Sequence, residues 1–540
     1  MTVDTFEHPY YPIIYVRGYA GTQGEVEETV ADPYMGFNVG STKIRQDWKG
    51  LIERYFFESP LVRMMKDFEY EDVYASGQDM PSGSPIRTRS IVIYRYYEPA
   101  SQDLGIGKRD EIETYATGLG NLILSLYDRL KDSVANNPGR FKVYLVAHSM
   151  GGLICRCFLQ NDSLLLTKEL GTLQQARKMV DKVFTYATPH NGIDVKLIGN
   201  LPGLISFNNS DTFNRGRMKD YLSLDAAAPD DDVSSLNGKF DPSRFFCLVG
   251  TNHRDYAVAG NMAAKIVGPM SDGLVRISNA TVWGPKEVAP GQWKDTEAPR
   301  AFVHRCHSGQ YGIVNSEEGF QNLTRFFFGN LRVDSKLLIQ SISLPNEVEE
   351  KMAADKKNVK ASYHFEVILR VRGKRWDLHR RLVSEESAIF RKFDEIFKPE
   401  KDQEARHPAL FSAFLSTNQR VNMVRPSLGF SIDLGVLVPE YEVDGLLFLD
   451  HHYEGGYLYR DKINLEALPP DPPPAPPVWR LGYGFDSQSP NQTTTVIDPE
   501  PADPTRASNG WVFKIPIKQL SKPGIDAILE LTATPWNEEE

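Results

Sequence analysis

The sequence is poor in cysteine. Its 540 residues include four cysteines, and their spacing is irregular: Cys155, Cys157, Cys247 and Cys306. Secreted domains that depend on disulfides carry more cysteines in regular frameworks, and a structural zinc site needs paired ligands at short spacing. We therefore expect neither a disulfide framework nor a zinc site, and we interpret the four side chains as buried free thiols in a reducing compartment.

Long apolar runs and an excess of positive charge are also missing. No stretch of about 18 apolar residues occurs, so no transmembrane helix is expected. The opening residues, MTVDTFEHPYYPIIYVRG, lack the basic segment and apolar core of a signal peptide. Lys and Arg total 61 against 71 for Asp and Glu, giving a net charge of −10, which argues against a nucleic-acid partner or a membrane held by bulk charge. The sequence predicts a cytoplasmic location, although signal-independent export leaves no mark of this kind.

The first 330 or so residues alternate between segments typical of strands and of helices. Hydrophobic residues make up 41% of the chain, which is enough to form real cores at this length. Strands are predicted within 12–21, 90–99, 141–149, 182–189 and 244–250, and helices within 111–137 and 151–160. Such alternation predicts the α/β fold class, with a doubly wound, mostly parallel sheet and helices on both faces.

The pattern changes near residue 335. Apolar residues alternate with polar ones in four segments, 363–373, 429–435, 509–517 and 526–534. This period of two predicts an antiparallel β-sandwich, interrupted by one helix over 383–398 and by a stiff proline-rich loop over 468–479.

The change of sequence pattern near residue 335 predicts two domains. A catalytic domain spans 1–333, with insertions near 24–89 and 191–243, and a β-rich accessory domain spans 334–540.

Residues 143–152, VYLVAHSMGG, place a serine between a buried strand and a helix. Ala147 and Gly151 are the small residues that a tight strand-to-helix turn needs two positions before and after an exposed serine. A serine becomes a strong nucleophile when a neighbouring base removes its proton. The start of the following helix directs backbone N–H groups toward the place where an oxyanion would form. Ser149 is therefore the predicted nucleophile, and the Met150 N–H is a predicted oxyanion donor.

A second oxyanion donor is expected after an early strand, in the segment PIIYVRGYAG (12–21). Gly18 lets the backbone approach closely because it has no side chain. The next residue, Tyr19, then supplies the second backbone N–H.

Four segments together resemble the lipase-type serine hydrolases of the α/β-hydrolase superfamily. They are VRGYAG, VAHSMGG, TYATPHNG (185–192) and SDGLV (271–275), which occur in the order expected of that family over roughly residues 10–330. Two positions differ from the usual pattern, with Arg17 in place of a histidine and Ala147 in place of a glycine. Neither change removes a catalytic group, but Arg17 is expected to alter the geometry of the oxyanion loop.

The resemblance implies a triad in the chain order serine, acid, histidine. SDGLV matches the segment that carries the acid, so Asp272 is the candidate, with a turn-forming Asp-Gly pair as the alternative. Asp194 and Asp255 are the other candidate acids, whereas the acidic run 230–232 is interpreted as a solvated loop.

The histidine is expected on the loop before the last helix of the domain, a helix beginning near Asn315 with Glu318 in a capping role. His304 and His307 both lie there. We favour His307, because the small residues that follow it place it on the loop, whereas His304 lies where a strand would end. His148 and His190 are interpreted as groups that order the elbow and the loop after the next strand. No cofactor or metal ligand pattern is found.

These residues predict a carboxylic-ester hydrolase that forms an acyl-enzyme on lipids or other acyl esters, as a lipase, phospholipase or esterase does. An acyltransferase with the same triad, or a non-catalytic interaction protein with a relic fold, are the alternatives.

The two insertions and the second domain are the parts of the chain that could determine which substrate reaches the site. The helical part of the second insertion, 195–207, could cover the site as a lid, or be a surface excursion. The aromatic residues of the first insertion would line the same cleft or fill a core. The accessory domain would present the catalytic domain to a membrane or other partner, or support it structurally.

Overall fold

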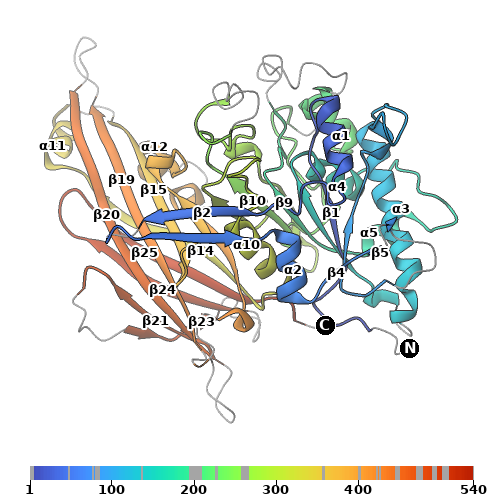
Figure 1. Cartoon of the computed structure of the whole chain (residues 1–540). Helices are drawn as coiled ribbons and strands as arrows, with labels where there is room; N and C mark the ends of the chain where they lie inside the picture. The colour runs from blue at the N-terminus through green and yellow to red at the C-terminus, as the bar shows by residue number, and fades with distance from the viewer. Residues whose placement is uncertain are drawn as a thin grey trace. The chain divides into compact units, whose positions relative to one another are not determined.

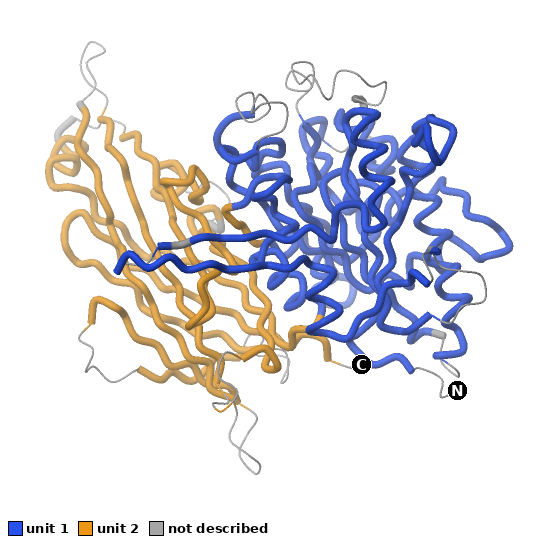
Figure 2. Tube along the Cα trace, viewed as in Figure 1, with its two compact units in different colours: residues 1–300, 305–327 blue, residues 301–304, 328–540 orange. Residues whose placement is uncertain are grey.

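The structure is a computed structural model. It describes residues 5–46, 49–75, 78–79, 86–134, 138–193, 210–225, 229–256, 267–355, 359–398, 403–420, 424, 427–443, 451–469, 478–488, 495–501 and 510–538. The chain divides into two compact units (Figure 2). Unit 1 comprises residues 1–300 and 305–327, and unit 2 comprises residues 301–304 and 328–540.

The centre of unit 1 is a parallel sheet (Figure 1) whose strands follow the order β10-β9-β8-β1-β7-β4. Strand β13, of which residues 301–303 belong to unit 2, follows later in the chain. Strand β8 lies between β1 and β9 and runs parallel to both, so that Ala147 lies opposite Val16 on one side and Thr185 on the other. The strands span β1 (Ile13–Val16), β4 (Glu71–Asp72), β7 (Ser90–Ile93), β8 (Val143–His148), β9 (Val180–Tyr186), β10 (Phe245–Gly250) and β13 (Arg300–Val303).

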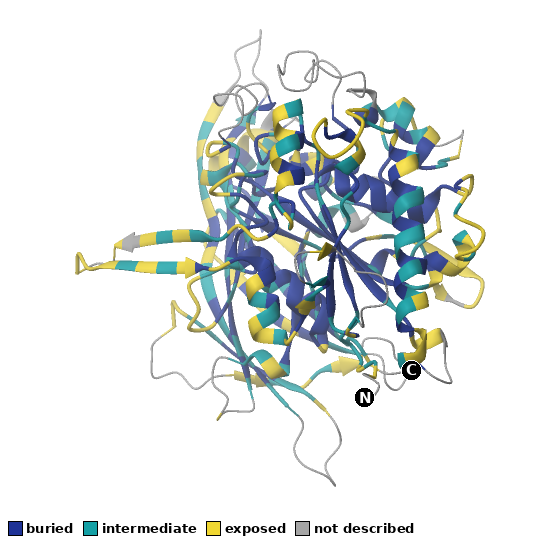
Figure 3. Cartoon of the chain, turned by 45° about the vertical axis from the view of Figure 1, so that its right-hand side comes forward, coloured by how far each residue is buried: buried dark blue, intermediate teal, exposed yellow. Residues whose placement is uncertain are grey.

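Both faces of this sheet are covered. Every residue of β1, β7, β9 and β10 is buried, although successive side chains point to opposite faces. Figure 3 shows these strands as the buried centre of the unit. Phe327 of α10 stacks on Tyr144 of β8 with ring centroids 4.2 Å apart. Helix α4 packs against α3 and against β8. The predicted doubly wound α/β class is confirmed.

The helices of unit 1 follow the sequence pattern closely. The helix predicted over 111–137 runs from Ile112 to Leu130 and buries the stripe of Leu119, Ile123, Leu126 and Leu130. The helices span α1 (Gln23–Ala31), α2 (Pro60–Phe68), α3 (Ile112–Leu130), α4 (Met150–Gln160), α5 (Leu173–Lys178), α8 (Arg215–Tyr221) and α10 (Glu317–Phe328). None of the helices in the described part of the chain is long and apolar enough to cross a membrane. All four cysteines are buried free thiols.

Part of the first insertion packs on α10. It contains α1, the hairpin of β2 (Ser41–Gln46) and β3 (Ile52–Phe57), and α2. Phe57 and Phe68 contact Phe320 of α10, with ring centroids 6.0 and 6.3 Å apart, and Arg63 of α2 forms an ion pair with Glu317 at 2.8 Å. Phe57 is buried and fills a core, whereas Phe68 is half-buried at its edge. Phe56 is exposed, and Trp48 lies outside the described residues.

Unit 2 consists of two antiparallel sheets, as the sequence predicts. One sheet has the order β18-β14-β25-β24-β23, and the other has the order β16-β15-β19-β20-β21-β22 with β17 also paired to β15. The elements span β14 (Leu331–Ser343), α11 (Asn346–Asp355), β15 (Val359–Val371), β16 (His379–Arg381), β17 (Ile389–Lys392), α12 (Phe393–Phe397), β18 (Ala409–Leu415), β19 (Leu428–Val443), β20 (His451–Leu468), β21 (Arg480–Phe485), β22 (Thr495–Ile497), β23 (Glu500–Pro501), β24 (Trp511–Gln519) and β25 (Gly524–Pro535).

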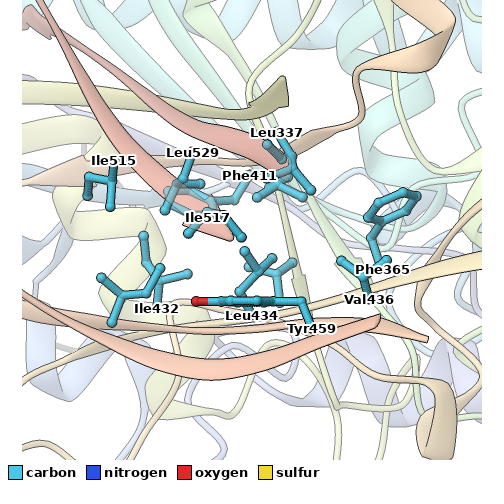
Figure 4. Packing of buried hydrophobic residues seen from close by; sticks show 14 of the residues in the cluster. Leu337, Phe365, Phe411, Ile432, Leu434, Val436, Tyr459, Ile515, Ile517 and Leu529 are labelled. Atoms are coloured by element: carbon cyan, nitrogen blue, oxygen red, sulfur yellow. The ribbon is translucent and has the colours of Figure 1, made fainter. Parts of the chain in front are cut away.

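The core of unit 2 is formed by the alternating side chains of these strands (Figure 4). Ile432, Leu434 and Val436 of β19 point toward residues of the other sheet, among them Ile517 and Leu529. All five side chains are fully or almost fully buried. The period of two in the sequence is thus the direct consequence of one face of each strand packing on this core.

The helix predicted over 383–398 is wrong. Residues Ile389–Lys392 form β17, which pairs with β15 through Phe365 and Ile389. Only Phe393–Phe397 are α-helical, and Val383–Glu385 form a single 3-10 turn. Ile389 of this edge strand is part of the core. Residues 470–477 of the proline-rich loop lie outside the described residues.

We predict that Ile432→Ala lowers the free energy of unfolding by about 2–5 kcal/mol, because a fully buried branched side chain leaves a cavity when it is truncated. Leu520→Ala, at a position that is 85% exposed, should change it by less than about 0.5 kcal/mol. Denaturant unfolding of the full chain measures both, and equal losses would show that this sheet face is not the core.

Candidate active site

Ser149 occupies a strained turn between β8 and α4. Its backbone has φ 53° and ψ −125°, values that residues other than glycine rarely adopt. Two hydrogen bonds from the neighbouring strand segment hold the turn. The Ser149 N–H donates to the Tyr186 carbonyl at 2.9 Å, and the Thr188 hydroxyl donates to the Ser149 carbonyl at 2.8 Å. The turn presents the hydroxyl at the end of β8, as expected of a nucleophile elbow.

Close backbone packing around the elbow requires two glycines. A Cβ added to Gly18 would lie 2.7 Å from the Cβ of Ser149, and one added to Gly151 would lie 2.3 Å from the carbonyl oxygen of Val16. Neither distance leaves room for a methyl group. By contrast, β8 accommodates the methyl group of Ala147, which is fully buried. The resemblance leads one to expect glycine at this position.

Two backbone N–H groups are available beside the serine. Among the residues that the structure describes, no acceptor takes a hydrogen bond from the N–H of Tyr19 or of Met150. Met150 is the first residue of α4, where backbone N–H groups and the helix dipole favour negative charge. The loop of Tyr19 is held by Tyr96, whose hydroxyl donates to the Arg17 carbonyl at 2.8 Å.

Ser149, His307 and Asp272 form one hydrogen-bonded line. His307 Nε2 lies 3.0 Å from Ser149 Oγ, and His307 Nδ1 lies 2.9 Å from Asp272 Oδ2. The exposed fractions of the three residues are 4%, 3% and 1%. The structure thus brings together the three residues that the sequence singled out, in the geometry that a general base and its orienting acid need.

Asp272 also organises the turn in which it lies. Its Oδ1 accepts the N–H groups of Leu274 and Val275 at 3.0 and 2.7 Å, which leaves Oδ2 for His307. The turn-forming role that the sequence offered as an alternative therefore coexists with the contact to histidine. Each carboxylate oxygen has its own partners, so the acid is fixed in orientation.

The other candidates for the histidine and the acid of the triad have different partners or lie outside the described residues. His304 follows β13, and its Nδ1 lies 3.5 Å from Glu385. Asp255 accepts a hydrogen bond from the Asn252 side chain at 2.6 Å. Asp194 lies outside the described residues.

The acidic run 230–232 is mostly exposed, as the sequence predicts for a solvated loop. Its last residue, Asp232, accepts the Trp283 indole N–H at 2.9 Å. Within the described ranges, no group of three His, Cys, Asp or Glu side chains could hold a metal ion.

No known protein family and no curated protein matches the chain. Among solved structures, it is similar to the lipase BlEst2 of Bacillus licheniformis in its propeptide form, with a TM-score of 0.31 and 11% identity over 85% of this chain and 95% of that one. It is also similar to the product of gene lin2722 of Listeria innocua, with a TM-score of 0.24 and 12% identity over 59% of this chain and 94% of that one. Superposition is poor in both cases, so the strand order and the elbow decide the fold. Unit 1 has an α/β-hydrolase fold.

His190 orders the loop that follows β9 of this hydrolase fold. The Thr185 hydroxyl donates to the Phe246 carbonyl at 3.2 Å, so its oxygen accepts from His190 Nε2, 3.1 Å away. The ring is fully buried. Burial and the nearby Arg156 charge lower the pKa of His190 well below its ordinary value, so the ring is neutral, as a structural histidine in this position should be.

Sequence reasoning missed Arg156 on α4. Its guanidinium is fully buried and donates to the carbonyls of His190, Val233 and Ser235 at 2.7, 2.8 and 2.8 Å. Burial lowers its pKa to about 10. Arg156 thereby joins the helix that follows the nucleophile to two separate loops. An arginine within an otherwise apolar run, MGGLICRCFL, was the available sequence signal.

Arg17, at the position where the resemblance leads one to expect a histidine, also has a visible role. Its Nη1 donates to the Met35 carbonyl at 2.5 Å, and this contact joins the loop after β1 to the turn after α1. Tyr256, which the sequence did not indicate, packs its ring edge against His307 with centroids 5.8 Å apart.

Ser149 opens into a cavity of about 520 Å³. Its apolar wall comes partly from the first insertion, through Met35 and Phe37, and partly from residues that flank undescribed segments, Ile193, Phe213 and Tyr256. The predicted lid helix over 195–207 lies outside the described residues. The described part of the first insertion lines the cavity through α1 and the turn after it rather than through the aromatic residues that the sequence suggested.

The neutral, buried His190 predicts a loss of stability in acid. An unfolded imidazole binds a proton near pH 6.5, whereas the folded one resists it, so below about pH 6.5 the unfolded state holds more protons and the free energy of unfolding falls. Replacing the ring should make this fall shallower by up to about 1.4 kcal/mol per pH unit. Denaturant unfolding of wild type and His190→Gln between pH 5 and 8 measures the difference; parallel curves would contradict it.

Proposed function

We propose that the chain is a serine hydrolase that cleaves carboxylic esters through an acyl-enzyme. The observation that carries this proposal is the unbroken line from Asp272 through His307 to Ser149, ending at a cavity. A buried carboxylate that holds an imidazole against a serine hydroxyl is the arrangement that activates a nucleophile.

Each residue has a definite part in the proposed reaction. His307 Nε2 takes the proton of the Ser149 hydroxyl as its oxygen attacks the ester carbonyl. The N–H groups of Tyr19 and Met150 stabilise the oxyanion, and His307 then gives the proton to the leaving alcohol. Water, activated by His307, releases the acid and restores the serine. Asp272 holds the imidazole in the required tautomer and stabilises its charged form.

The cavity walls support an apolar acyl group. Phe37, Ile193, Phe213, Leu274 and Val314 lie along it, and burying an acyl chain against such residues is favourable by about 25 cal/mol per Å² of apolar surface. Lipids and other acyl esters fit this wall. Peripheral membrane contact, through the second insertion or unit 2, stays a prediction.

The charged residues of the cavity favour an uncharged ester. Three acidic residues, Glu25, Glu28 and Asp32, line the cavity together with Arg17. Asp32 is engaged by the N–H groups of Tyr34 and Gly36 at 2.9 and 2.6 Å, and Glu25 caps α1, whereas Glu28 is exposed. Their summed field should lower the local concentration of anionic substrates.

We predict that Ser149→Ala lowers kcat by at least about 10³-fold on whichever ester the wild type cleaves, because the nucleophile is lost. The measurement is turnover of p-nitrophenyl esters and phospholipids of increasing chain length, with labelling by a fluorophosphonate probe. Ser278→Ala, at an exposed serine, is the matched control and should retain both. His307→Ala should abolish labelling and His304→Ala should not.

Full turnover by Ser149→Ala would refute the proposal, as would a wild type that the probe does not label. Acyl transfer to an added alcohol in preference to water would assign the same triad to a transferase. Activity that rises with chain length and at a lipid interface would mark a lipase rather than a soluble esterase.

A charge reversal tests the role of Glu28. We expect Glu28→Lys to raise kcat/KM for an anionic ester relative to its neutral analogue by a few-fold at low salt, and the gain to shrink at 0.5 M salt because exposed charges are screened. Glu169→Lys, at an exposed position outside the cavity lining, makes the same change in net charge. An equal gain in both variants would show that net charge, not the cavity, is responsible.

A further inference from the structure

His148, the last residue of β8, touches the loop that carries the proposed base. Its Nε2 lies 2.9 Å from the backbone carbonyl oxygen of His307. A carbonyl oxygen only accepts hydrogen bonds, so Nε2 carries the proton and donates it. The contact therefore fixes the tautomer of His148, with the hydrogen on Nε2 and the lone pair on Nδ1.

This bond completes the support of the His307 main chain. The His307 N–H donates to the Asp272 carbonyl at 2.9 Å, while the His307 carbonyl accepts from His148. The backbone of the base is thus held on one side by the residue that carries the acid and on the other by the neighbour of the nucleophile. His148 thus joins the loop to β8, a buried strand that is paired on both sides.

The surroundings of His148 keep its ring uncharged. Burial, the neighbouring His307 and Arg17 hold the pKa of His148 well below its ordinary value. The rings of His148 and His307 lie 4.9 Å apart, so a charged His148 would repel the imidazolium form of His307. A neutral ring supplies the hydrogen bond without that repulsion.

We propose that His148 is a positioning residue, which holds the backbone of His307 through its Nε2–H so that the imidazole stays aligned with Ser149. This inference rests on the proposed function. It is separate from the chemistry, since His148 exchanges no proton with the substrate. Misplacement of a base by about 1 Å can cost about 10²-fold in rate, which sets the size of the expected effect.

Three substitutions isolate the hydrogen bond. His148→Phe keeps a flat ring but has no donor. In His148→Gln the side-chain amide reaches the position of Nε2, and in His148→Asn it ends one carbon short. We expect kcat to fall about 10–100-fold in the Phe and Asn variants, with KM within about two-fold of wild type, and Gln to recover most of the loss. Rates of fluorophosphonate labelling should follow kcat, and His452→Phe, at an exposed histidine, should match wild type.

The comparison of Gln with Asn decides the question even where the Phe variant does not fold, because the two amides differ by one methylene group. Unchanged kcat in Asn, or an equal loss in Asn and Gln, would overturn the assignment. A loss that follows the melting temperature through all three variants would do the same. A wild type that cleaves no ester and takes up no probe would instead refute the proposed function.

Discussion

The backbone conformation of Ser149 is the constraint on which the site depends. Holding a serine at φ 53° costs about 1–3 kcal/mol, and the surrounding structure must offset that cost. Thr188 and the carbonyl of Tyr186 fix the turn from the next strand, while the missing side chains of Gly18 and Gly151 let two backbones approach it. The strain and the tight packing have one result, which is a hydroxyl that projects from a rigid sheet beside two open N–H groups.

A second requirement follows from burying this turn. Polar groups around it have lost water and must find protein partners, or they would destabilise the fold. Arg156 meets this requirement for three backbone carbonyls, His190 for a threonine hydroxyl, and His148 for the carbonyl of His307. The two histidines are held neutral. The two rings therefore satisfy these polar groups without adding positive charge.

The sequence predicted the parts of this arrangement that depend on local pattern. The sheet, the sandwich, the elbow at Ser149 and the turn of Asp272 each carry a short-range signature of period, small residues or turn chemistry. His307 could be separated from His304 only through the resemblance and the flanking small residues. Arg156 and Tyr256 could not be placed, because their partners lie far away in the chain and no spacing records such contacts. The helix at 383–398 failed for a related reason, since pairing with β15 outweighed local propensity.

The proposed chemistry and the choice of substrate also differ in how far the sequence predicts them. Ser149 directly follows β8, a strand that is hydrogen-bonded to a neighbour on each side, so the sheet fixes the backbone from which its hydroxyl projects. The cavity wall is built instead from Met35 and Phe37 of the first insertion and from Ile193 and Phe213 beside the second. Such side chains need only be apolar and of suitable volume, so many sequences would serve. A motif can therefore point to a nucleophile at Ser149 without specifying which acyl group that serine would receive.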